Sequence, residues 1–235
     1  MGDFQYVGSE LDLFAVVYNW KDYWSKQVRP FISGEVLEVG AGIGSNTPYL
    51  DKGEATRWVC LEPDPQLVAH LEEQLGGKMR RCEVVCGTLQ TMDAEARFDT
   101  IIYIDVLEHI ENDRDELAAA SGRLKSGGHV IVLSPAHQSL YTPFDAAIGH
   151  FRRYNRSMLQ SITPESLRVV SLKYLDSIGL SASAANRLFL RQSMPTKEQL
   201  AVWDRWMVPL SQIIDPVIGY SIGKTIVGVW QKVPV

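Results

Sequence analysis

Short apolar runs alternate with helical patterns along the first 135 residues of the chain. The runs at residues 35–39, 57–61, 82–86, 99–104 and 129–134 have the length of buried strands. The run at 99–104 is almost continuously apolar, which is typical of a parallel sheet covered on both faces. One helical pattern begins at Asp64 or Pro65, and another spans residues 112–125, where Gly127 and Gly128 follow. The alternation predicts a doubly wound, mostly parallel α/β sheet.

The two ends of the chain depart from this alternation. Residues 10–29 predict one amphipathic helix, because apolar side chains, Trp20 and Trp24 among them, recur every three or four positions. Beyond residue 135 we expect a loop to about residue 155, a strand near 170–174, helices over 178–219 and a last strand at 225–230. The prediction is a seven-stranded, Rossmann-like sheet in a single domain, residues 1–235. Its parts are an N-terminal covering helix (1–30), a core (31–176), a helical insertion (177–220) and the last strand (221–235).

Composition narrows the classes of function. The chain has 235 residues, of which 46% are hydrophobic and 22% charged, so it is neither disordered nor fibrous. Its net charge of −5 lacks the basic footprint of a nucleic-acid-binding protein, and we expect no nucleic-acid partner. Residues 207–230 are interrupted by two prolines, an aspartate and a lysine, which argues against a transmembrane segment.

The cysteines give no sign of metal or disulfide chemistry. There are three, and neither their spacing nor a following histidine fits a zinc site, so we expect no metal. Cys60 and Cys86 lie in apolar runs and are predicted to be buried free thiols. An odd count without a secretory signal indicates a reducing, cytoplasmic location.

The clearest chemical signal is the glycine loop after the first predicted strand, with the sequence EVGAGIG. Glycines at that position allow a tight turn and close approach of a ligand to the backbone. Glu38 precedes the loop and favours a cationic ligand over a pyrophosphate. Glu62, at the end of the second strand, can accept hydrogen bonds from both hydroxyls of a ribose. The combination predicts a site for an adenosyl cofactor.

Four motifs in this order resemble those of the class I S-adenosylmethionine-dependent methyltransferases. They are EVGAGIGSNT (38–47), LEPD (61–64), FDTIIYIDVLEHIENDRDEL (98–117) and RLKSGGHVIVLSPA (123–136). The resemblance covers about residues 15–180. It implies an enzyme that transfers methyl groups and uses S-adenosylmethionine.

The resemblance also implies cofactor contacts. Glu38 and the Gly40 backbone would hold the methionine ammonium, Glu62 the ribose, and Thr88 or a backbone carbonyl the adenine, since the usual acidic residue of that third site is missing. Asp105 and the two residues after it would line the sulfonium side. The full set is Glu38, Gly40, Ala41, Gly42, Gly44, Asn46, Thr47, Glu62, Pro63, Gly87, Thr88, Leu89, Asp105, Val106 and Leu107.

The acceptor is expected beyond the carboxyl ends of the fourth and fifth strands, where open α/β sheets bind ligands. The segments there, 106–110 and 135–154, are rich in titratable groups. His150 is our first candidate for a general base and His137 the second, because histidine changes protonation near neutral pH. A carboxylate acceptor would need no base, and both histidines would then be spectators. The candidate substrate-binding residues are Tyr18, Tyr23, His109, Tyr141, Arg152 and Arg153.

Several of these residues have a second interpretation. Arg152 and Arg153 either clamp a carboxylate or phosphate on the acceptor, or one of them pairs with an acid such as Asp145 to fix the loop. Tyr18 and Tyr23 lie off the tryptophan stripe of their helix, which favours a place near the cofactor sulfonium. The aromatic insertion at 178–219 roofs the acceptor pocket, forms a dimer interface or contacts lipid; we favour a roof combined with a homodimer interface.

The block LYTPFDAAIGHFRRYNRSML (140–159) is similar to a bacterial subgroup of these methyltransferases tied to cell-surface glycan, lipid or secondary-metabolite pathways. It implies a small-molecule, lipid-linked or saccharide acceptor. Two other functions stay open. One is a protein that binds the cofactor without turnover. The other, a nicotinamide dinucleotide oxidoreductase, is disfavoured by the GxGxG spacing, by Glu38 and by the lack of hydride-transfer residues.

Overall fold

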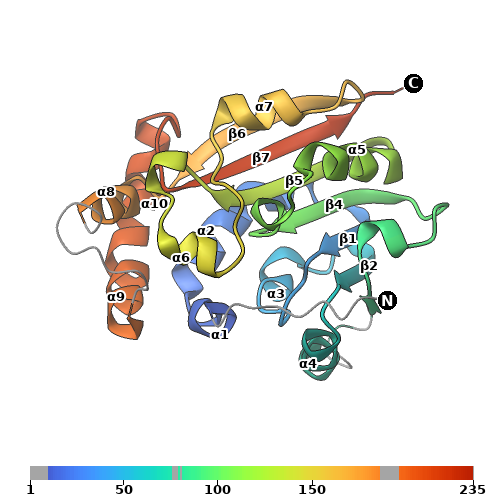
Figure 1. Ribbon diagram of the computed structural model, residues 1–235, viewed down its shortest axis with the longest axis horizontal. Helices are drawn as coiled ribbons and strands as arrows, with labels where there is room; N and C mark the ends of the chain where they lie inside the picture. Colours follow the sequence, from blue (N-terminus) through green and yellow to red (C-terminus); the bar gives the residue numbers. More distant parts are fainter. Residues whose placement is uncertain (1–9, 76–78, 80, 186–195, 235) are drawn as a thin grey trace.

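A single seven-stranded sheet forms the centre of the computed structural model, which describes residues 10–75, 79, 81–185 and 196–234 (Figure 1). The strand order is β3-β2-β1-β4-β5-β7-β6; β7 runs antiparallel to both of its neighbours, and the other pairs are parallel. The strands are β1 (Gly34–Val39), β2 (Ala55–Glu62), β3 (Cys82–Cys86), β4 (Phe98–Ile104), β5 (Leu124–Pro135), β6 (Leu167–Leu175) and β7 (Thr225–Lys232). The predicted fold class is confirmed.

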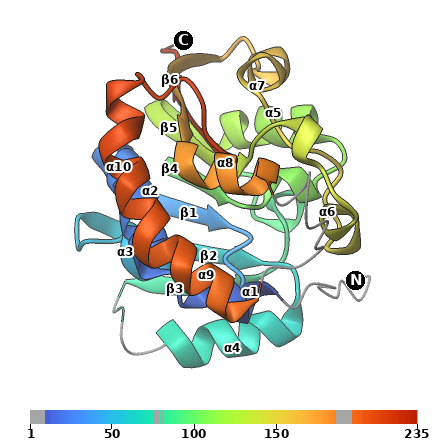
Figure 2. The ribbon, with the colours of Figure 1, turned by 90° about the vertical axis from the view of Figure 1, so that its left-hand side faces the viewer.

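Helices cover both faces of this sheet (Figure 2). One face carries α2 (Tyr18–Val28), α3 (Thr47–Leu50), α4 (Pro65–Leu75) and the C-terminal helices α9 (Lys197–Val202) and α10 (Val208–Val217), which the π-helical turn η6 (Trp203–Met207) joins. The other face carries α5 (Asp113–Arg123) and α7 (Arg156–Ile162). The remaining helices are α1 (Glu10–Ala15), α6 (Pro143–Ala147) and α8 (Ser177–Ala185).

Alternation along β4 shows why its apolar run is continuous. Ile102 and Ile104 belong to the core beneath α2 and α4, whereas Ile101 and Tyr103 belong to the core beneath α5 and α7. Successive side chains of a strand point to opposite faces, so a strand covered on both sides needs apolar residues at every position. The same rule accounts for the apolar runs of β1, β2 and β5.

The N-terminal segment forms two helices where the sequence predicts one. α1 ends at Ala15, and Val17 has a non-helical backbone, with φ −89° and ψ 80°. Asp204 of η6 supplies the reason: its carboxylate accepts the backbone N–H of Trp20 at 2.8 Å and that of Asn19 at 3.2 Å. A carboxylate remote in sequence therefore satisfies the free N–H groups that begin α2.

The junction of α5 and β5 also differs from the prediction. The helix ends at Arg123, and β5 begins at Leu124 and includes Gly127 and Gly128, where its register against β4 is irregular. A Cβ on Gly128 would lie 2.7 Å from the carbonyl oxygen of Asp99. These glycines therefore allow β5 to pass close to the start of β4, and they do not terminate the helix.

Buried carboxylates fasten the C-terminal helices to the rest of the domain. Asp215 of α10 accepts the hydroxyl of Tyr23 and the backbone N–H of Asp176, both at 2.7 Å. Asp176, at the end of β6, in turn accepts the indole N–H of Trp203 at 2.7 Å. Asp204, Ser211 and Asp215 are the buried polar side chains among residues 197–217. No helix in the described part of the chain is long and apolar enough to cross a membrane.

The cysteines are free thiols in different environments. Cys60 of β2 is buried, as predicted. Cys86 is exposed, so the predicted burial of that thiol is wrong. It ends β3, which is an edge strand with a neighbour on one side only.

We expect Gly128→Val to lower the free energy of unfolding by about 1–3 kcal/mol, because the added side chain meets backbone of β4 that cannot move aside. Gly122→Ala is the matched control. A Cβ at Gly122, inside α5, meets nothing within 4 Å, and alanine there should stabilise the helix by about 0.5–1 kcal/mol. Urea denaturation of both variants measures the difference; equal shifts would contradict this account of Gly128.

Candidate functional site

The glycine loop meets the segment that follows β4. After β1 the chain turns at Gly40, which has a left-handed φ of 66°. A Cβ on Gly40 would lie 2.6 Å from Cγ2 of Val106, so glycine is needed for this contact. Strand order reverses between β1 and β4, which is the point at which doubly wound sheets form a ligand crevice.

Glu62 is bonded to the glycine loop. One carboxylate oxygen accepts the backbone N–H of Gly42 at 2.9 Å, and the other accepts that of Asp64 at 3.0 Å. Burial raises the pKa of Glu62, and these two hydrogen bonds oppose the rise. A carboxylate has about four acceptor sites, so acceptor capacity for two hydroxyl groups is left. Glu62 and the glycine loop, on which the prediction of an adenosyl site rests, are therefore adjacent.

Glu38 is enclosed behind the same loop. Its Oε2 accepts the hydroxyl of Thr47 at 2.8 Å and the indole N–H of Trp58 at 3.0 Å. Burial raises its pKa to about 7. Glu38 therefore changes its charge near neutral pH, and a nearby cation favours the ionised form.

Lys21 of α2 lies in the same region and was missed by the sequence analysis. Its ammonium donates to the carbonyl of Ser45 at 3.0 Å, and the side chain is buried. Burial lowers its pKa to about 8, while Asp105 and Glu38 act in the opposite direction. One signal was available: Lys21 interrupts an aromatic helical segment, and buried lysines are rare without a charged partner.

The segment after β3 lies next to Glu62. The N–H of Gly87 donates to the carbonyl oxygen of Glu62 at 2.9 Å. Leu89 is buried, and Thr88 is exposed with its own N–H bonded to Thr91. The predicted adenine-side residues and the predicted ribose carboxylate are thus neighbours, with Pro63 half-buried beside them.

The remaining predicted cofactor residues line the loop and the end of β4. Asp105 is exposed and has a left-handed φ of 53°, a backbone conformation that often marks functional sites. Val106 contacts the loop and Leu107 is buried. Within the loop Ala41 is buried, and Asn46 precedes α3 without a side-chain cap bond.

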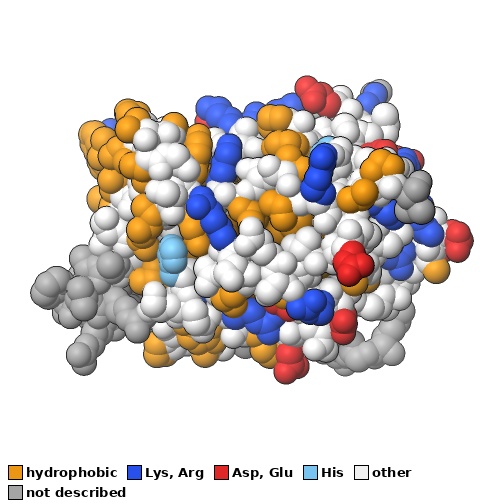
Figure 3. Space-filling model, turned by 90° about the horizontal axis from the view of Figure 1, so that it is seen from above, with side chains coloured by type: hydrophobic (Ala, Val, Ile, Leu, Met, Phe, Trp, Pro, Cys, Tyr) orange, Lys and Arg blue, Asp and Glu red, His pale blue; other side chains and the backbone are white. Residues whose placement is uncertain are grey.

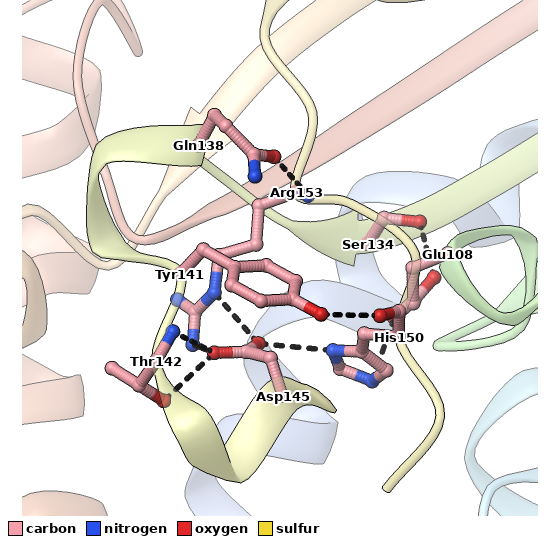
Figure 4. A network of polar contacts seen from close by, with 8 residues as sticks. All are labelled: Glu108, Ser134, Gln138, Tyr141, Thr142, Asp145, His150 and Arg153. Atoms are coloured by element: carbon pink, nitrogen blue, oxygen red, sulfur yellow. Dashed lines mark hydrogen bonds and ion pairs between the residues drawn. The ribbon is translucent and has the colours of Figure 1, made fainter. Parts of the chain in front are cut away.

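Asp145 organises the loop after β5 (Figure 4). It accepts hydrogen bonds from Nδ1 of His150 at 3.0 Å and from Nε and Nη2 of Arg153 at 2.8 and 3.0 Å, and it caps α6 through Thr142. Burial opposes ionisation, but the bonds from His150 and Arg153 prevail and hold its pKa well below the usual range. Arg153 therefore pairs with Asp145, which is the loop-fixing role and one of the two roles predicted for it.

Glu108 and His109 border His150 on its other side. Ser134, at the end of β5, donates its hydroxyl to Oε2 of Glu108 at 2.8 Å, while Oε1 lies 4.0 Å from Nε2 of His150. Burial, and next the charge of Asp105, raise the pKa of Glu108 well above its usual value. Burial and the adjacent His150 ring, 4.5 Å away, lower the pKa of His109 to about 4. Burial thus favours the uncharged form of both side chains.

Three other candidates have partners within the protein. Arg152 pairs with Asp113 at 2.5 Å and donates to two backbone carbonyls. His137 stacks on Tyr174 with 4.9 Å between ring centroids, and its Nε2 lies 2.9 Å from the carbonyl oxygen of Gly223. Tyr141 donates its hydroxyl to the carbonyl of His150 at 2.5 Å.

The two tyrosines of α2 have separate positions. Tyr18 is exposed at the first turn of the helix. Tyr23 is buried, and its hydroxyl donates to Asp215. Its predicted contact with the substrate is not supported, because the ring packs in the core and the hydroxyl has a partner from α10. Among the described residues, no three or more His, Cys, Asp or Glu side chains are placed to hold a metal ion.

Comparisons with known proteins agree with this geometry. Residues 37–130 match a family model described as a methyltransferase domain. An S-adenosylmethionine-dependent methyltransferase from Clostridium acetobutylicum has the same fold, with a TM-score of 0.60, 11% identity, and 96% of each chain covered. The N-methyltransferase NodS from Bradyrhizobium japonicum, in complex with S-adenosyl-L-homocysteine, gives a TM-score of 0.58 at 11% identity, covering 92% of this chain and 88% of that one.

Residues 37–130 therefore belong to a methyltransferase domain, and the chain has the fold of S-adenosylmethionine-dependent methyltransferases. A curated relative, the tRNA U34 carboxymethyltransferase of Haemophilus ducreyi, is 27% identical over 107 residues. That match covers 45% of this chain and 33% of the relative, so it spans about a third of that protein's length.

The residues of this methyltransferase domain fit its cofactor, S-adenosylmethionine. A Cβ on Gly42 would meet only Leu11, at 3.7 Å, so the backbone there is open to a ligand. Lys21 and Glu38 provide one charge of each sign for the carboxylate and ammonium of a methionine group. Glu62 provides the acceptor for the ribose hydroxyls.

We expect Glu62→Ala to weaken binding of S-adenosylhomocysteine to the methyltransferase domain at least tenfold. Each hydrogen bond lost to a charged group is worth about 1.5–3 kcal/mol. Glu62→Gln keeps the shape and should lose less, whereas Gly42→Val should bind least, because its side chain fills the ligand space. Glu73→Ala, an exposed change on α4, is the control. Isothermal titration gives the affinities; wild-type affinity in all variants would locate the cofactor elsewhere.

We expect Asp145→Asn to lower the free energy of unfolding by about 3–5 kcal/mol at pH 7, since it leaves Arg153 and His150 without their buried carboxylate. The folded pKa of Asp145 lies below its unfolded value of about 3.9, so the stabilisation is present above that pH and is lost as the pH falls further. The stability difference between the wild type and the variant should therefore begin to shrink as the pH falls below about 4. Asp115→Asn, exposed on α5, is the control for denaturation measured from pH 7 to pH 3.

Proposed function

We propose that this chain transfers a methyl group from S-adenosylmethionine to a small-molecule, lipid-linked or saccharide acceptor that binds beyond the ends of β4 and β5. The observation that carries the proposal is the cluster of Asp145, His150, Glu108 and His109, which lies beside the cofactor loop. S-adenosylmethionine supplies an electrophilic methyl group on a sulfonium centre. Positioning of the acceptor opposite that methyl then accounts for much of the rate.

A chain of contacts supports this location. Gly40 of the cofactor loop contacts Val106 of the segment after β4. Two residues further on, the carbonyl of Glu108 accepts the N–H of Phe151 at 2.8 Å, which joins that segment to the loop after β5. The cofactor loop, the segment after β4 and the loop after β5 therefore adjoin one another along one edge of the sheet. An acceptor bound between the latter two would lie next to the cofactor loop.

The arrangement of His150 supports its assignment as general base. Asp145 accepts from Nδ1, which leaves the lone pair of the neutral ring on Nε2. Among the described residues Nε2 has Glu108 as its neighbour at 4.0 Å, which is longer than a hydrogen bond. This orientation presents Nε2 as the proton-accepting atom toward a hydroxyl or ammonium acceptor.

Charge and neighbouring side chains support the acceptor class. Arg152 and Arg153 are paired with Asp113 and Asp145, so neither is a free clamp for a phosphate backbone. The net charge of −5 also disfavours a polyanionic acceptor. The curated relative acts on tRNA, which makes RNA the alternative that an experiment has to include.

The acceptor class is tested by incubating the protein with S-adenosylmethionine labelled in the methyl group and three separate extracts: polar metabolites, lipids, and total RNA. We expect label in the metabolite or lipid fraction. Label in RNA alone would contradict the acceptor class and leave methyl transfer intact. Binding of S-adenosylhomocysteine with no labelled product in any fraction would favour a cofactor-binding protein without turnover.

We expect His150→Ala to lower kcat about 10²–10⁴-fold with little change in cofactor affinity. His150→Asn keeps a donor toward Asp145 and should be equally slow if the proton is what matters. His137→Ala tests the second candidate, and His70→Ala on the exposed face of α4 is the control. A wild-type rate in His150→Asn would make His150 a structural residue of the loop. Arg152→Ala should raise KM if Arg152 exchanges its partner Asp113 for the acceptor. It should leave KM unchanged if Arg152 stays paired with Asp113.

A further inference from the structure

The continuous helix from α9 through η6 to α10 has an apolar outer face. Five of its large hydrophobic side chains are exposed by half or more, and they recur every three or four residues along one side. They are Val202, Trp206, Leu210, Ile213 and Val217, the last of them 82% exposed. We call these five residues the apolar stripe. Single exposed hydrophobic residues are common, but a regular row on one helix face marks a contact surface.

The inner side of this helix is both apolar and acidic. Trp203 and Val208 pack in the core, while Asp204 caps α2 and Asp215 accepts hydrogen bonds from Tyr23 and the end of β6. The exposed charged side chains from 197 to 217 are Lys197, Glu198 and Arg205, a net charge of +1, whereas the whole chain has a net charge of −5. The guanidinium of Arg205 lies 5.3 Å from the centre of the Trp206 ring.

The size of the stripe distinguishes two occupants. From Val202 to Val217 the helix rises about 22 Å, and its side chains span about 10 Å, which gives a footprint of roughly 200–250 Å². A stable dimer buries about 800 Å² on each partner. A second copy packed on this stripe alone therefore falls short of a stable interface, whereas a bilayer surface accommodates a narrow row of apolar side chains without shape complementarity.

Charge around the helix also suits a lipid surface. Lys197 begins α9, next to Glu198, and Lys173 lies 4.6 Å from the ring of Tyr220, just beyond α10, while donating to Gln27 of α2. Figure 3 shows hydrophobic side chains gathered at the left-hand end of the molecule, which carries these helices, with most charged side chains over its middle and right. Tryptophan and arginine are residues that favour the boundary between headgroups and acyl chains.

We propose that the apolar stripe docks this chain on the surface of a phospholipid bilayer, with the helix lying in the interface and not crossing it. β7 begins opposite the end of β5, so the preceding helix lies at the edge of the sheet where the acceptor loop is (Figure 1). Docking there brings that edge to the membrane. The inference is independent of the acceptor assigned above, because it concerns binding and not methyl transfer.

Trp206 provides a direct probe of the proposal. The other five tryptophans, at positions 20, 24, 58, 203 and 230, are buried, whereas Trp206 is 62% exposed. We expect vesicles of phosphatidylcholine with 30 mol% phosphatidylglycerol to shift the tryptophan emission to the blue and to reduce its quenching by acrylamide. Brominated acyl chains should quench the emission. In Trp206→Phe these optical changes should disappear while the protein still floats with vesicles.

Flotation with matched variants completes the test. Ile213→Ser combined with Val217→Ser should reduce the vesicle-bound fraction about tenfold or more, since apolar area is lost. Val169→Ser combined with Val170→Ser, which changes exposed valines on β6, should leave it unchanged. Vesicles of phosphatidylcholine alone should bind more weakly. Circular dichroism and S-adenosylhomocysteine binding check that each variant is folded.

Three results would overturn the proposal. One is a wild-type protein that stays out of the vesicle fraction. Another is flotation that the α10 variant and the β6 variant reduce equally. The third is self-association in light scattering that Ile213→Ser with Val217→Ser abolishes while vesicles have no effect, which would assign the stripe to a second copy of the chain.

Discussion

The parallel pairing of β1 with β4 is the constraint on which the site depends. The connections from these strands leave toward opposite faces of the sheet, so a crevice opens between their ends. Gly40 and Val106 meet there without room for a side chain on Gly40. Glu62 reaches the same loop from β2 and Ser134 reaches Glu108 from β5, so the order of the strands decides which polar groups can meet.

Carboxylates in this domain differ in charge because their partners differ. Glu38 and Glu108 are both enclosed, receive hydrogen bonds from neutral groups, and have raised pKa values. Asp145 is equally buried but accepts from a guanidinium and an imidazole, and its pKa is lowered. The cofactor side therefore has an acid whose pKa is raised to about 7, whereas beside His150 the pKa of Asp145 is lowered and that of Glu108 is raised.

The C-terminal helix connects the site with the surface. Its buried acids bond to α2, which carries Lys21 into the cofactor region, and to the end of β6. Trp203 and Val208 pack inward as well, so this helix has apolar side chains on its buried face and again on its exposed face. That departs from the usual amphipathic arrangement, in which the exposed face is polar. The proposed lipid docking would give the exposed apolar face a partner, and it would bring the loop after β5 close to the membrane.

The sequence by itself determined the sheet, because every strand covered on both faces has to be apolar at successive positions, and β4 and β5 are. It also determined the glycine loop and Glu62, since the backbone at Gly40 and the carboxylate after β2 are local requirements of the turn. Tertiary structure alone decided the rest. Asp204, far along the chain, caps α2 and so divides the predicted N-terminal helix in two. Asp215 accepts a hydrogen bond from the hydroxyl of Tyr23, and the hydrophobic periodicity of the sequence did not indicate that Tyr23 is buried. Lys21, Glu108 and the apolar stripe became visible only after folding, because burial and charge state depend on neighbours that are distant in sequence.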